Sequence, residues 1–289
     1  YFFLRLSFFI ATVVVDTFFI VFVFAPLKFF LSKKYNTLLF NLSRKFDLYI
    51  YMPTIIKPNY KNLLLNNIES IVSDYEIKGF VISNISGFEL LKKYIGNEKY
   101  TFIANYTMNI FNEYSIQELQ SLGINVVTPS VELNKSILQN LCSNSPLPVE
   151  LIAYGRNVLM NSSYCILGKS NKCYPKCDMK CKNCTSSTFA SLSDNLNTSV
   201  TDNSCTAKYY IKDRLGFKFR IIPDNIQTVT SIYNSKITSI DTHDFKISAV
   251  RINILDENIE EINNIVTSVK NGNKLEGKEY TNGNLNRDI

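Results

Sequence analysis

Six of the seven cysteines gather in one short segment, where their thiolates could act together as metal ligands. They are Cys165, Cys173, Cys177, Cys181, Cys184 and Cys205, with seven, three, three, two and twenty residues between successive members. Thiolates two to four residues apart can turn toward one ion or cluster without strain. The spacing supports an iron–sulfur cluster and a structural zinc ion about equally, whereas disulfides would require an oxidising compartment. The segment therefore predicts a metal centre.

Positive charge surrounds these cysteines. Lysines interleave with the thiols at Lys169, Lys172, Lys176, Lys180, Lys182 and Lys208, and the whole chain carries 31 basic and 25 acidic residues for a net charge of +6. A basic metal-bearing loop suits contact with RNA phosphates, and lysines that serve only solubility are an equally good interpretation. Cys142 stands apart in a predicted helix, where we expect it to be a small buried apolar residue.

The rest of the composition excludes several familiar chemistries. His243 is the single histidine, so a zinc site with two histidine ligands is impossible. The chain has no Gly-x-Ser-x-Gly elbow and no glycine-rich phosphate-binding loop. His243 lies between Asp241 and Asp244 in a polar stretch, and we expect a solvated loop residue there rather than a general base.

Four polar residues near predicted strand ends are candidates for substrate binding. Asn105 and Asn109 follow a strand and could hydrogen-bond a polar substrate, although asparagines also cap helices and shape turns. Glu132 could face the same edge, or it could be the acidic residue in the first turn of a helix. Arg156 could bind a carboxylate or phosphate through two parallel hydrogen bonds, or form a surface ion pair.

These candidates must be positioned by alternating strands and helices. Apolar runs and helical spacing predict strands at residues 18–24, 47–52, 79–82, 100–104, 125–128, 150–153, 217–222 and 249–254, and helices near 33–44, 60–73, 87–94, 116–122, 132–141 and 257–270. This alternation indicates βαβ units and a parallel sheet. We expect a TIM-barrel-like (β/α)8 fold with a cysteine-rich insertion at residues 165–208, and a doubly wound open sheet is the alternative.

The N-terminal apolar run, residues 8–30, is long enough for a membrane-spanning helix. Asp16 in its middle makes insertion costly, and the flanking runs at residues 8–15 and 18–24 have strand length. We therefore expect two buried strands of a parallel sheet and no stable membrane span. A signal peptide is not expected, because only Arg5 precedes the run and no small-residue cleavage site follows.

Several segments, in order, resemble the collagenase-like peptidases, peptidase family U32. They are KGFVISNISGFELL (78–91), TFIANYTMNIFN (101–112), LGINVVTPSVEL (122–133), ELIAYGRNVLMNSSYCIL (150–167), YYIKDRLGFKFRIIPD (209–224) and YTNGNLNR (280–287). The resemblance covers residues 47–289 and matches residues 1–15 poorly. It implies one barrel domain over residues 1–289, and because family members often occur as longer chains, this would be the C-terminal part of one.

The resemblance also implies a chemistry. Better-understood relatives are hydroxylation factors that act on a transfer-RNA or ribosomal-RNA base, or on a quinone precursor, and bind a 4Fe–4S cluster through four cysteines. Their cysteine pattern begins after the Glu-x-x-x-x-Gly-Arg strand, as Cys165 does here. A further family ligand usually follows the aspartate that Asp224 resembles, but residues 225–228 contain no cysteine. The histidine that some relatives carry after the same strand is Tyr154 here.

The expectation is therefore a cytoplasmic, iron–sulfur-dependent hydroxylation factor for an RNA base. Its cluster would be bound by Cys165 and three of Cys173, Cys177, Cys181 and Cys184. One alternative is a protease, as the family name implies, with a protein or peptide substrate. The other is a zinc-stabilised binding module without catalysis.

Overall fold

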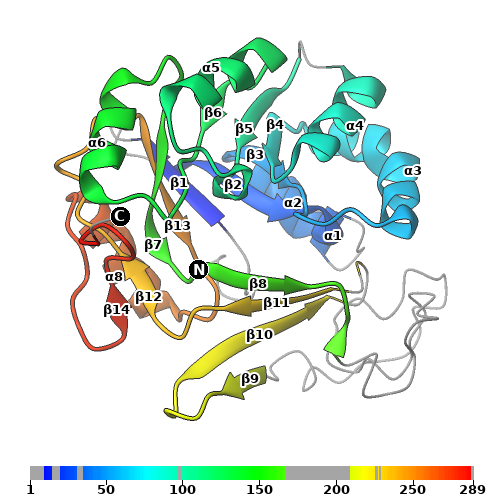
Figure 1. Ribbon diagram of the computed structural model, residues 1–289. Helices are drawn as coiled ribbons and strands as arrows, with labels where there is room; N and C mark the ends of the chain where they lie inside the picture. The colour runs from blue at the N-terminus through cyan, green and yellow to red at the C-terminus, as the bar shows by residue number, and fades with distance from the viewer. Residues whose placement is uncertain are drawn as a thin grey trace.

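Five parallel strands form the centre of a mixed α/β fold (Figure 1). The computed structural model describes residues 10–14, 20–30, 35–96, 99–166, 209–224, 227 and 229–287. The five strands, each paired in parallel with the next, are β2 (Ile20–Pro26), β3 (Asp47–Tyr51), β4 (Gly79–Ile82), β5 (Thr101–Ala104) and β6 (Val126–Val127). All four residues of β4 are buried, as expected for a parallel strand covered on both faces.

Helices connect these strands and lie along their outer side (Figure 1). They are α1 (Leu27–Phe30), α2 (Asn36–Ser43), α3 (Pro58–Asp74), α4 (Ile85–Ile95), the short 3-10 helix η2 (Tyr106–Met108), α5 (Glu113–Leu122) and α6 (Lys135–Asn144). Asn84, Asn112 and Asn134 cap α4, α5 and α6 by accepting a backbone N–H three residues on. Because Asn134 is the cap, α6 begins three residues after the predicted start at residue 132.

The sheet continues beyond the five strands. Its complete order is β14-β12-β7-β13-β1-β2-β3-β4-β5-β6. The added strands are β1 (Ile10–Val14), β7 (Glu150–Gly155), β12 (Ile237–Ser239), β13 (Ala249–Asn253) and β14 (Tyr280–Thr281), and helix α8 (Ile259–Lys270) follows β13. β7 and β13 are parallel. A single parallel bridge, Val127 to Val149, also joins β6 to the residue before β7.

The predicted direction of the first strand is wrong. β1 runs antiparallel to both of its neighbours, β2 and β13. Too few residues separate Val14 from Ile20 for the crossover that a parallel pair requires, so the chain must turn back on itself. Both apolar runs are nevertheless strands, and no helix within the described ranges is long and apolar enough to cross a membrane.

A second, four-stranded antiparallel sheet lies against the ends of the first sheet (Figure 1). Its order is β8 (Val158–Ser162), β11 (Val229–Tyr233), β10 (Lys218–Asp224) and β9 (Tyr209–Lys212). Of these strands only β10 corresponds to a predicted strand. The turn between β9 and β10 contains Gly216 at φ 89°, a conformation that favours glycine. Residues 167–208, most of the predicted insertion, lie outside the described residues.

Candidate functional site

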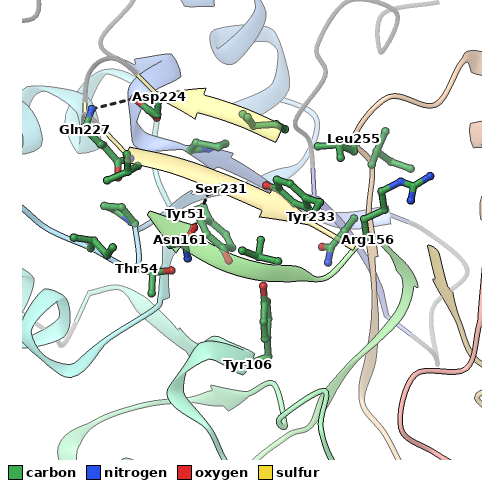
Figure 2. A pocket seen from close by; sticks show the side chains of 18 residues that line it. Tyr51, Thr54, Tyr106, Arg156, Asn161, Asp224, Gln227, Ser231, Tyr233 and Leu255 are labelled. Carbon is green, nitrogen blue, oxygen red and sulfur yellow. Dashed lines mark hydrogen bonds between the residues drawn. The ribbon is translucent and has the colours of Figure 1, made fainter. Parts of the chain in front are cut away.

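A cavity of about 170 Å³ lies between the carboxyl ends of the main-sheet strands and the second sheet (Figure 2). From the main sheet and its loops it is lined by Pro26, Tyr51, Pro53, Thr54, Ile55, Tyr106, Arg156, Asn253, Ile254 and Leu255. The second sheet and its β10–β11 turn contribute Val158, Asn161, Ile222, Asp224, Gln227, Val229, Ser231 and Tyr233. Ligands of open parallel sheets and barrels bind at this end of the strands.

Three tyrosines give the cavity its aromatic character. Tyr51 ends β3, Tyr106 begins the 3-10 helix after β5, and Tyr233 ends β11. Burial raises the pKa of all three hydroxyls, and the proximity of Tyr51 adds to the effect on the pKa of Tyr106 and Tyr233. These hydroxyls stay protonated at neutral pH, so they present flat rings together with neutral hydrogen-bonding groups.

Polar groups complete the lining. The Ser231 hydroxyl donates to Asn161 Oδ1 at 2.7 Å, and one carboxylate oxygen of Asp224 accepts the Gln227 N–H at 3.0 Å (Figure 2). Asn253 Oδ1 is buried and has no hydrogen-bond partner among the described residues. A buried acceptor without a partner costs free energy.

Beneath the cavity, a buried polar network holds Tyr51. Arg251, on β13, is completely buried and donates to Asn105 Oδ1 at 2.7 Å and to Thr128 Oγ1 at 2.9 Å. Its guanidinium also forms an ion pair with the buried carboxylate of Glu150. Asn105 Nδ2 in turn donates to the Tyr51 hydroxyl at 2.6 Å. The charge pair therefore fixes the amide that orients a tyrosine of the cavity wall.

The structure separates the four predicted substrate-binding residues. Arg156 lines the cavity, with its Nη1 donating to the carbonyls of Asn234, at 2.9 Å, and Ser235. Asn105 lies behind the wall in the network just described. Asn109 is exposed and ends η2 in the left-handed conformation, with φ 53°. Glu132 is also exposed, and neither of these two residues lines the cavity.

The other residues singled out from the sequence lie elsewhere. Tyr154 is buried and its hydroxyl donates to Glu257 Oε1 at 3.1 Å, so burial and this carboxylate raise its pKa. His243 is an exposed turn residue whose Nδ1 lies 2.9 Å from Asp241 Oδ1, and it does not line the cavity.

Only the first of the five predicted metal ligands falls within the described residues. Cys165 follows β8 and is 2% exposed, while Cys173, Cys177, Cys181 and Cys184 lie outside the described ranges. Lys57, which donates to the Ser163 carbonyl at 2.7 Å, interacts electrostatically with Cys165. Burial lowers the pKa of Lys57, and the cysteine opposes this shift. The described part of the chain contains no group of three or more His, Cys, Asp or Glu side chains that could hold a metal.

The structure is that of a mixed α/β protein with a cavity at the carboxyl ends of its parallel strands. No protein-family model matches the chain, and no curated protein matches it. A comparison with solved structures finds a U32 peptidase at 14% identity and a TM-score of 0.36, over 46% of this chain. The match spans 60% of that structure. It is a distant similarity in fold only.

Proposed function

We propose that the protein binds one flat polar ring in the tyrosine-lined cavity and acts as an iron–sulfur-dependent hydroxylation factor on an RNA base. The observation that supports ring binding is the size and lining of the cavity. Its volume of about 170 Å³ resembles that of an engineered cavity of about 150 Å³ that binds benzene. A single six-membered ring therefore fits.

The residues that line the cavity favour the binding of a flat ring over proteolysis. A hydrolytic nucleophile needs a neighbouring base, or a metal-bound water. The described cavity lining contains no cysteine, histidine or lysine, and the Ser231 hydroxyl donates to an amide oxygen rather than to a base. Three tyrosine rings, by contrast, suit stacking on a planar substrate. The amide group of Asn161 suits hydrogen bonds to its polar edge.

We also propose that the main sheet closes into a barrel of the U32 type. The bridge from Val127 to Val149 and the hydrogen bond from the Val127 N–H to the Pro148 carbonyl, at 3.1 Å, support closure between β6 and β7. With these contacts, β6 would pair with β7, and the eight strands β7, β13, β1, β2, β3, β4, β5 and β6 would form a closed ring. The cavity would then lie at the mouth of the barrel, where loops at the carboxyl ends carry the active site.

The cluster of this proposal would be held by Cys165 and three of Cys173, Cys177, Cys181 and Cys184. The donor chemistry of Cys165 fits, because cysteine sulfur is the usual ligand of iron–sulfur clusters, and the Lys57 side chain interacts electrostatically with it. When bound, a 4Fe–4S cluster would supply electron transfer to or from the ring. The residues of the chain would bind and orient that ring: the tyrosines would cover its faces, and the amide of Asn161 would hydrogen-bond to its edge.

The first prediction concerns Cys165. Protein purified without oxygen should be brown, with iron and sulfide bound, and Cys165→Ala should lose most of both because a ligand is removed. Cys142→Ala is the matched control. Cys142 is buried in α6, and burial raises its pKa to about 11, so it stays a thiol. Absorption spectra with iron and sulfide analyses would measure the effect.

Other outcomes would select the competing functions. Colourless protein with one bound zinc would contradict the cluster and favour the binding module. Peptide cleavage that survives replacement of all six clustered cysteines would favour a protease. Mass spectrometry of RNA nucleosides from a strain lacking the gene tests the substrate: one hydroxylated base should disappear, and an unchanged RNA profile would contradict the proposal.

A further inference from the structure

The face of β10 that lines the cavity continues outward along the same strand. Side chains alternate between the two faces of a strand, so Ile222 and Asp224 in the cavity share a face with Arg220 and Lys218. At about 3.3 Å per residue, the seven-residue strand is about 20 Å long. One continuous face of the second sheet therefore runs from the cavity to the turn of the β9–β10 hairpin. Figure 1 shows this hairpin, β9–β10, projecting from the molecule.

An aromatic ring lies on this face beside a fixed cation. Tyr210 is the cross-strand partner of Arg220, and the guanidinium carbon of Arg220 lies 5.6 Å from the centroid of the Tyr210 ring. Asp256 holds Arg220 in place through an ion pair of 2.7 Å. Tyr210 is 48% exposed. A cation held against a partly exposed ring makes that ring a stacking platform for a planar group.

Further out on the same face, two lysines oppose each other directly. Lys212 and Lys218 are cross-strand partners, both are exposed, and neither forms an ion pair with a described residue. Like charges placed opposite each other destabilise a hairpin. Arg214 in the turn adds a third exposed cation. The single acid of the turn, Asp213, accepts the N–H groups of Leu215 and Phe217 on one carboxylate oxygen, at 2.9 and 2.8 Å, and within this described hairpin it forms no ion pair with either lysine.

We infer that the β9–β10 hairpin binds the single-stranded RNA that flanks the base in the cavity, an inference that rests on the proposed function. The uncompensated lysines would contact phosphates, and Tyr210 would stack on a neighbouring base. An acidic peptide would satisfy the charges. The acidic side chains themselves would leave the cation-backed ring unused, and they offer no ring for the cavity on the same strand face.

The test measures binding of a short labelled RNA strand without self-complementarity, by fluorescence anisotropy over a range of salt concentrations. Tyr210→Ala should weaken binding about tenfold, because one stacked base is lost. The double variant Lys212→Ala/Lys218→Ala should reduce the slope of log affinity against log salt by about 1.4, because two phosphate contacts are lost at about 0.7 each.

Matched controls come from surfaces away from the second sheet. Tyr114→Ala removes a 72% exposed tyrosine from α5, and Lys78→Ala/Lys93→Ala removes two exposed lysines. Both should bind like the wild type. Equal binding by the hairpin variants and the wild type would overturn the inference. So would a polyglutamate peptide of matched charge that binds the hairpin as tightly as the RNA does.

The inference and the proposed function can fail separately. Cys165→Ala should keep RNA binding, because the hairpin does not depend on the cluster. If hairpin-dependent RNA binding is found while RNA from the gene-deletion strain keeps every modification, the hydroxylation proposal fails and the binding surface stands. If the modification is lost but the hairpin variants bind RNA normally, the surface is wrong and the function stands.

Discussion

Arg251 carries a full charge into the interior of the sheet, where a countercharge and hydrogen-bond acceptors offset the cost of burying it. Its partners Glu150, Asn105 and Thr128 come from three other parts of the chain, and the Phe24 ring lies 5.0 Å from the guanidinium carbon. Arg251 Nε remains without a hydrogen-bond partner in the described structure. A single substitution of a buried charge with so many partners leaves those partners buried and unpaired, and this destabilises the fold.

We therefore predict that Arg251→Met destabilises the fold by about 3–5 kcal/mol, because it leaves the Glu150 carboxylate buried without its countercharge. Urea unfolding followed by circular dichroism would measure the loss. The double variant Arg251→Met/Glu150→Gln removes both charges and should recover part of it. If the double variant loses as much stability as the two single variants together, Arg251 and Glu150 do not stabilise each other and the prediction is wrong.

At the residue scale, the sequence indicated part of the site. Asn105 and Arg156 were predicted from their places after strands, and both are at or behind the cavity wall. Tyr51 and Tyr233 were missed because tyrosine is common in ordinary cores, and nothing in their local spacing distinguishes a cavity wall. Asn253 and Arg251 lie inside an apolar strand, where only the packed structure shows what they face.

Helix α8 shows how local chemistry sets the limits of an element. Asn258 Oδ1 accepts the Glu261 N–H at 3.0 Å, and Glu261 Oε2 accepts the Asn258 N–H at 2.6 Å. This reciprocal capping box satisfies two backbone donors at the start of the helix. The predicted helix, residues 257–270, ends at the observed last residue and begins two residues early, because Asn258 is the cap.

Replacing the cap should weaken the fold by a predictable amount. We predict that Asn258→Ala lowers the free energy of unfolding by about 1 kcal/mol, because the first turn loses a hydrogen-bond acceptor. Thermal and urea unfolding would detect this. Asn264→Ala, at an exposed position within α8, should be neutral or slightly stabilising, because alanine favours helix. Equal losses in both variants would show that the cap is not responsible.

Among the elements, the central strands and helices could be predicted from the sequence, and most of the second sheet could not. The predicted strand 79–82 coincides with β4, since a short apolar run after a glycine is a strong local signal. β8 and β11 are only partly buried, and their pairing joins segments far apart in the chain. Such strands lack a clear alternating pattern, so only tertiary packing defines them.

Across the whole molecule, several tyrosine side chains are buried. Burial raises the pKa of Tyr49, Tyr51, Tyr60, Tyr106, Tyr154 and Tyr233, and for Tyr49 the value is about 12. In the unfolded chain these groups ionise near pH 10. Above that pH the unfolded state therefore binds fewer protons than the folded state, and the free energy of unfolding falls as pH rises.

We predict cooperative alkaline unfolding that begins above about pH 10. The part of the tyrosinate absorbance that comes from these six side chains should rise in one late step that coincides with the loss of secondary structure by circular dichroism. Below that pH, ionisation of these six tyrosines contributes no pH dependence to stability. Gradual ionisation of all the tyrosines before any structural change would show that these side chains are not buried as described.

The reversed strand β1 has a consequence for synthesis on the ribosome. It pairs on one side with β2, its immediate successor, and on the other with β13, which is made more than two hundred residues later. Until β13 emerges, the nascent hairpin presents a bare row of backbone donors and acceptors that another chain could capture. The pairing of β1 with β13 is long-range and therefore slow. Newly made chains should depend on chaperones until these two strands have paired.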